Sequence, residues 1–162
     1  MKLVRQTADW LWLGVRGVEF LAPAFDLAIR LYLANVFFKS GLVKIQSWQT
    51  TLSLFEYEYA VPLLPPTVAA YLGTAAELVL PVFLALGLAG RLAALALFAF
   101  NLVAVTSYPD ISEAGVKDHV LWGWLIAVAF FHGPGKLSLD RVIGRWYQSG
   151  SARTDAGAPR TS

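Results

Sequence analysis

Four long apolar stretches dominate this 162-residue sequence and lie at about residues 25–44, 67–88, 91–108 and 116–132. A helix needs about 17–25 largely apolar residues to cross the hydrocarbon core of a bilayer. The second stretch meets this length easily, the third is at its short end, and the uncharged part of the fourth begins only at Val120. Apolar residues make up 57% of the chain and charged residues only 15%, whereas soluble domains hold about 45–50% and about 25%. We therefore expect a membrane protein with four spanning helices. The alternative for the fourth is a re-entrant segment that enters and leaves the membrane on the same side.

The residue types that are missing exclude several kinds of chemistry. The chain has no cysteine, which removes thiol catalysis, disulfides and iron–sulfur ligation. His119 and His132 lie 13 positions apart on one expected helix, or about 20 Å, so they cannot bind one metal ion within a monomer. Neither a nucleophile triad nor a phosphate-binding glycine loop is recognisable. The small net charge of +2 is not gathered into a basic stripe, which argues against nucleic-acid binding. We expect no catalytic residue, no metal and no covalent cofactor.

The basic residues of the connections predict the topology, because cytoplasmic loops carry an excess of Lys and Arg. Nine of the 13 basic residues fall on the side that holds both termini, and two, Lys44 and Lys117, fall on the other. Both termini should therefore be cytoplasmic. The expected fold class is an all-α integral membrane four-helix bundle with interfacial amphipathic helices. It divides into an N-terminal interfacial helix at 1–24, the four-helix domain at 25–137 and a basic tail at 138–162 that is disordered from Ser149.

Two segments outside the spans show a helical stripe. In residues 1–24, Trp10, Leu13, Gly17, Phe20 and Leu21 share one face. In residues 47–59 the stripe is Trp48, Leu52, Phe55 and Tyr59, which is helical spacing. An anchor at headgroup depth is the favoured interpretation of both. The second segment has the alternative of contacting a partner or of covering the bundle as a lid.

Charged residues inside the spans are the strongest indication of a site, because an unpaired charge is costly in hydrocarbon. Glu77 lies in the middle of the second span and needs a cation or a proton. Arg30 is the predicted partner, and Asn101 and Tyr108 of the third span extend the expected polar cluster. On the first span, Asp26, Arg30, Gly41 and Lys44 fall on one helical face. This cluster has two interpretations that stay open: a charge-paired clip that sets helix register, or a ligand or proton site.

The motifs on these helices resemble the DoxX family of small four-helix membrane proteins. The resemblance covers about residues 25–137 and depends on Arg30 with Gly41-Leu-Val-Lys44, on Tyr59-Ala-Val-Pro62-Leu-Leu-Pro65-Pro66, on Glu77-Leu-Val-Leu-Pro81 and on Gly87-Leu-Ala-Gly90-Arg91. It implies a bundle in the bacterial inner membrane, associated with redox enzymes and with oxidative-stress or metal-stress systems. By analogy, Arg30, Lys44, Glu77 and Arg91 occupy motif positions of the family. Asp26, Gly41, Pro81, Gly87 and Arg91 are expected to serve structure or topology.

The redox role that the resemblance implies needs a diffusible carrier or a partner, because a chain without cysteine has no thiol centre of its own. We therefore expect an accessory membrane subunit, not an enzyme by itself, that binds a quinone-like ligand or a partner protein around Arg30, Glu77, Asn101, Tyr108 and Lys44. One alternative is a small proton-coupled transporter with Glu77 titrating at mid-membrane. Another is an assembly factor that recognises a partner's helix. The oligomeric state is left open.

Overall fold

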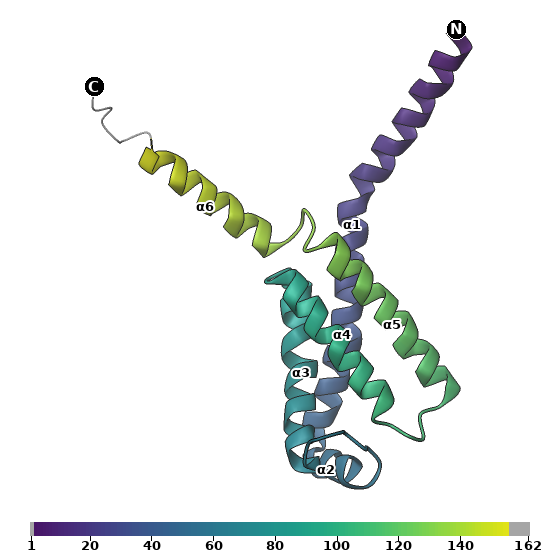
Figure 1. The fold of residues 1–162 in the computed structure, drawn as a ribbon, viewed down its shortest axis with the longest axis vertical. Helices are drawn as coiled ribbons and strands as arrows, with labels where there is room; N and C mark the ends of the chain where they lie inside the picture. The colour runs from purple at the N-terminus through teal and green to yellow at the C-terminus, as the bar shows by residue number, and fades with distance from the viewer. Residues whose placement is uncertain (1, 156–162) are drawn as a thin grey trace.

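The computed structural model describes residues 2–155 as six α-helices, with no strand in that range. They are α1 (Lys2–Gln46), α2 (Trp48–Tyr57), α3 (Pro66–Leu86), α4 (Gly90–Thr106), α5 (Glu113–His132) and α6 (Leu139–Asp155). The described residues outside loops and turns are all helical, which confirms the all-α prediction. Figure 1 shows α1, α3, α4 and α5 side by side, with α2 at one end and α6 leaving from the other.

Within residues 2–155, three helical segments are long and apolar enough to cross a membrane: Gly14–Gln46, Pro66–Leu86 and Glu113–His132. The α4 helix is equally apolar in character but spans only 17 residues, or about 25 Å. Residues 116–132, which the sequence supports least strongly as a membrane span, belong to a continuous 20-residue helix.

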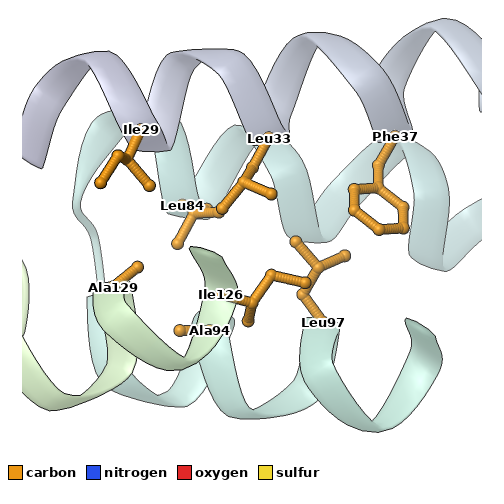
Figure 2. Packing of buried hydrophobic residues seen from close by; sticks show 8 residues of the cluster. All are labelled: Ile29, Leu33, Phe37, Leu84, Ala94, Leu97, Ile126 and Ala129. Carbon is orange, nitrogen blue, oxygen red and sulfur yellow. The ribbon is translucent and has the colours of Figure 1, made fainter. Parts of the chain in front are cut away.

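The four central helices form a ring in which each packs on two neighbours. The most extensive contacts join α1 to α3 and α4 to α5, and the ring is closed by α3 with α4 and by α1 with α5. Its core consists of Ile29, Leu33 and Phe37 of α1, Leu84 of α3, Ala94 and Leu97 of α4, and Ile126 and Ala129 of α5 (Figure 2). The alanines of α4 and α5 let these two helices approach closely, as small residues do in membrane bundles.

The two ends of the ring differ, and we name them by their contents. The hairpin end holds the turn between α3 and α4, where Gly87 (φ 62°) and Ala89 (φ 48°) adopt left-handed conformations. The α2 end holds α2 and the loops before α3 and after α4 (Figure 1). The aromatic stripe of α2 faces the bundle, because Phe55 is buried against Ala69 and Ala70 of α3 with Trp48, Leu52 and Tyr59 around it.

Two parts of the chain differ from the sequence-based expectation. The segment 1–24 is not a separate helix, since α1 continues from Lys2 to Gln46 with Pro23 inside it. The N-terminal part of α1 leans away from the part that packs in the bundle (Figure 1), as is expected of a helix that contains proline. Where the sequence predicts a tail disordered from Ser149, α6 extends over residues 149–155. A helix that has formed its first turns extends readily into a less favourable sequence. Residues 156–162 lie outside the described part.

At Gly41, α1 packs closely against α3. A Cβ atom there would lie 2.9 Å from Cγ of Leu78 and 3.1 Å from Cβ of Glu77. We expect Gly41→Ala to lower the free energy of unfolding by about 1–2 kcal/mol, because overpacking outweighs the better helix propensity of alanine. The matched control is Gly17→Ala in the same helix, where a Cβ atom would meet nothing within 4 Å. That variant should be neutral or slightly stabilised when both are compared by thermal unfolding in mild detergent. Equal stability of the two variants would contradict this account of the α1–α3 contact.

Candidate functional site

A cavity of about 450 Å³ lies at the α2 end of the bundle. Its walls come from the C-terminal half of α1, from α2, α3, α4 and α5, and from the loops that flank α2 and α4. Most of the lining is apolar, with Phe37, Phe55 and Phe100 among the larger side chains. The polar lining residues are Ser40, Lys44, Tyr59, Glu77, Ser107, Tyr108, His119 and Trp122. A cavity of this size and composition suits a small organic ligand.

Glu77 forms its ion pair with Lys44 in the cavity wall. The ammonium Nζ of Lys44 donates to both carboxylate oxygens, at 2.7 Å to Oε1 and 2.6 Å to Oε2. Ser40, one turn before Lys44 on α1, donates to Oε1 at 3.1 Å and accepts from Nζ at 3.1 Å. Both charged side chains are largely buried, with exposures of 15% for Lys44 and 8% for Glu77. The charge of Glu77 is therefore neutralised within the bundle.

The predicted pairing of Arg30 with Glu77 is not found. Arg30 is 2% exposed and points to the hairpin end, where it donates to the carbonyl oxygens of Leu84 at 3.4 Å, Ala85 at 3.3 Å and also Leu137. The carbonyls of the last helical turn lack intrahelical partners and carry the negative end of the helix dipole. The carbonyls of Leu84 and Ala85 are level with Arg30 along the bundle axis and therefore serve as its acceptors. Lys44, which lies on the same face of α1 at the other end, is level with the carboxylate.

Asn101 and His119 clip α4 to α5. The Asn101 amide donates to the backbone oxygen of His119 at 2.9 Å, and its Oδ1 lies 2.8 Å from Nδ1 of His119. The imidazole stacks edge-to-face on Trp122 at 4.9 Å and lines the cavity. Asn101 was predicted as part of the polar cluster, whereas His119 was considered only as a metal ligand. The missed signal is that the two residues stand opposite each other in the antiparallel α4–α5 hairpin.

An aromatic row closes the cavity on its α2 side. The rings of Phe55 and Tyr59 lie 4.9 Å apart, and those of Tyr59 and Tyr108 lie 5.1 Å apart. The backbone N–H of Ala60 donates to the carbonyl of Ser107 at 2.7 Å, which ties the loop after α2 to the end of α4. Burial raises the pKa of Tyr59, and the nearby Tyr108, Glu77 and Glu58 raise it further. The phenol therefore stays protonated at neutral pH and can serve as a donor.

Two polar atoms of the cavity lining lack a partner among the described residues. They are Oγ of Ser107 and Nε1 of Trp122, both shielded from solvent. A buried donor without an acceptor costs free energy, and most such groups in native proteins find a partner. Both residues line the cavity, while the two atoms themselves are covered by neighbouring groups.

The remaining predicted residues lie at the hairpin end. Asp26 of α1 contacts His132 of α5, with Oδ1 3.1 Å from Nδ1. Gly87 provides the left-handed C-cap of α3, where a Cβ atom would collide with Arg30 and Ser138. Pro81 is buried inside α3, and the exposed Arg91 lies beside Gly133. The predicted cluster is thus split between the two ends of the bundle, with Lys44, Glu77 and Tyr108 at the cavity and Arg30 away from it. Among the described residues, no group of three or more His, Asp or Glu could hold a metal ion.

The apolar helices and the mainly apolar cavity between them define a small helical membrane protein. The chain belongs to the DoxX family, whose model matches residues 25–109. It is also similar to a protein of Haemophilus influenzae described as uncharacterized, at 28% identity over 132 residues, which cover 77% of this chain and 87% of the other. No solved structure matches the chain significantly.

Proposed function

We propose that this DoxX protein binds a membrane-dissolved quinone-like molecule in the cavity at the α2 end, as an accessory subunit of a redox or stress-response system. The observation that carries the proposal is the cavity itself. It has a volume of about 450 Å³ and is lined mainly by apolar side chains, together with a set of hydrogen-bonding groups. Ligand pockets commonly combine apolar walls with a few polar groups that orient the ligand. A quinone ring with two carbonyl groups has the matching chemistry.

The hydrogen-bonding groups favour an acceptor-rich ligand. The indole N–H of Trp122 can only donate, and the unpartnered hydroxyl of Ser107 can do so. Tyr59 is a further donor, because a phenol is protonated at neutral pH and burial raises its pKa still higher. A quinone carbonyl can only accept, so it would satisfy these donors without adding a charge to the bundle.

The entrance supports a ligand that arrives from the lipid. Leu72 of α3 and Val103 of α4 line the cavity and are also exposed on the outer surface of the bundle, at 55% and 41%. In a membrane this surface faces the acyl chains. An apolar ligand could enter between α3 and α4 and leave its tail in the bilayer. With both termini cytoplasmic in the inner membrane, as the basic residues predict, the cavity would lie toward the opposite side.

A cavity-filling variant tests the proposal. Ala104 of α4 lines the cavity, and Ala104→Phe should weaken the binding of menadione by tenfold or more because the phenyl ring occupies the ligand's space. The measurement is quenching of tryptophan fluorescence by menadione, titrated into the full-length protein in nanodiscs. The matched control is Ala99→Phe on the exposed side of the same helix, which should bind like the wild type.

Equal affinity of the two variants, or unsaturable quenching of the wild type, would contradict the proposed ligand. The second result is what an assembly factor without a quinone site predicts. Trp122→Phe should weaken binding by about tenfold, since a net hydrogen bond contributes about 1 kcal/mol or somewhat more. Because this variant removes one fluorophore, its affinity is best measured by the shift in unfolding temperature with menadione.

A further inference from the structure

Helix α6 is joined to the bundle by its first turn. The backbone N–H of Asp140 donates to the carbonyl of Gly87 at 3.1 Å. The Asp140 carboxylate accepts from the backbone N–H groups of Ala89 at 2.8 Å and Gly90 at 2.9 Å, which caps the N-terminus of α4. Beyond this point α6 points away from the four central helices (Figure 1). The N-terminus of α6 is therefore fixed at the hairpin end.

The described side chains of α6 divide into an apolar and a polar face. Val142, Ile143, Trp146 and Tyr147 repeat at positions that share one side of a helix, and their exposures are 62%, 49%, 75% and 75%. Arg141, Gly144 and Arg145 lie on the other side by the same periodicity. Two exposed aromatic side chains beside two arginines form the pattern of a helix that lies at a membrane surface.

The length of α3 places the start of α6 at the membrane boundary. From Pro66 to Leu86 this helix has 21 residues, or about 31 Å, which matches a hydrocarbon core of about 30 Å. Gly87 then lies at the edge of the core, and Asp140 is hydrogen-bonded to it. The apolar face of α6 therefore begins at the depth where acyl chains meet headgroups.

The charges at this level are mainly positive. Arg91, Lys136 and Arg141 are exposed near the junction, while the negative charge of Asp140 is used in capping α4. We propose that α6 lies in the bilayer interface at the hairpin end, with Trp146 and Tyr147 among the headgroups and the basic side chains on anionic phospholipid. This interaction surface is separate from the quinone cavity and does not depend on it.

The absence of cysteine allows a direct test with single spin labels. Full-length Ile143→Cys and Gly144→Cys proteins are labelled and reconstituted into phosphatidylcholine vesicles with and without phosphatidylglycerol. Ile143 is on the apolar face, and at Gly144 a side chain would meet nothing within 4 Å. With phosphatidylglycerol, the label at 143 should collide with oxygen and be shielded from a water-soluble nickel chelate. The label at 144 should show the reverse preference.

Charge dependence is tested by adding Arg141→Glu to the 143-labelled protein. Each basic residue near an anionic surface changes the ratio of bound to free helix by a factor of about five, so charge reversal should raise nickel accessibility markedly. This increase should be absent in vesicles of phosphatidylcholine alone. Access of nickel to both labels would place α6 in water and overturn the proposal. Shielding of the 143 label from both reagents would indicate a protein contact instead, and indifference to phosphatidylglycerol would overturn the role of anionic lipid.

Discussion

Replacing Glu77 by leucine, with Lys44 left in place, should destabilise the protein by about 3–5 kcal/mol. The ammonium group of Lys44 would lose both carboxylate contacts, at 2.6 and 2.7 Å, and remain uncompensated in the cavity wall. Lys44→Met should cost a similar amount for the opposite reason, since it leaves the carboxylate unpaired. The double variant should be more stable than either single one, because an apolar pair of similar size needs no desolvation of charge.

The measurement is the free energy of unfolding in mixed micelles for the wild type, both single variants and the double variant. Lys39→Met is the matched control, since Lys39 lies on the same helix but is exposed, and it should change stability by less than about 0.5 kcal/mol. Single variants as stable as this control would show that the pair makes no contribution to the fold. A ligand role of Glu77 is then read from menadione binding by the double variant, separately from stability.

Arg30 and Glu77 should behave as energetically independent residues. Their predicted contact is replaced by two separate ones, and the carbonyls that Arg30 binds stand 7 and 8 residues beyond Glu77 on α3, or about 10–12 Å along the axis. In a double-mutant cycle with Arg30→Leu and Glu77→Leu, the coupling energy should be below about 0.5 kcal/mol. The cycle with Lys44→Met and Glu77→Leu should give a coupling of about 3 kcal/mol or more.

Arg30→Leu by itself should cost about 3 kcal/mol or more, because it removes the guanidinium donor from the carbonyls of Leu84, Ala85 and Leu137, of which Leu84 keeps only the N–H of Gly87. Arg30→Lys should restore only part of this loss, since a single ammonium group cannot reproduce the planar fork of the guanidinium. The cycles are measured as unfolding free energies in the same micelles. A strong Arg30–Glu77 coupling would contradict the arrangement described here and restore the pairing predicted from the sequence.

Several features follow from the sequence because they depend on local pattern. The long apolar stretches require membrane helices, since backbone groups in lipid must be satisfied within the helix itself. The observed α3, α4 and α5 begin and end within three residues of the expected spans 67–88, 91–108 and 116–132. The stripe of Trp48, Leu52 and Phe55 likewise predicts α2. In each case the periodicity or length alone decides the element.

The partner of each buried charge was decided only by the tertiary structure. Arg30 and Lys44 occupy one face of α1, so sequence spacing offers both to Glu77. The choice depends on the axial register in which α1 packs on α3, and the close contact of Gly41 with Leu78 sets that register. In this register Lys44 is level with the carboxylate, and Arg30 is level with the carbonyls of Leu84 and Ala85 at the end of α3. The sequence of a single helix does not specify its axial position relative to its neighbours. That position places Lys44 and Glu77 at the cavity and Arg30 at the hairpin end.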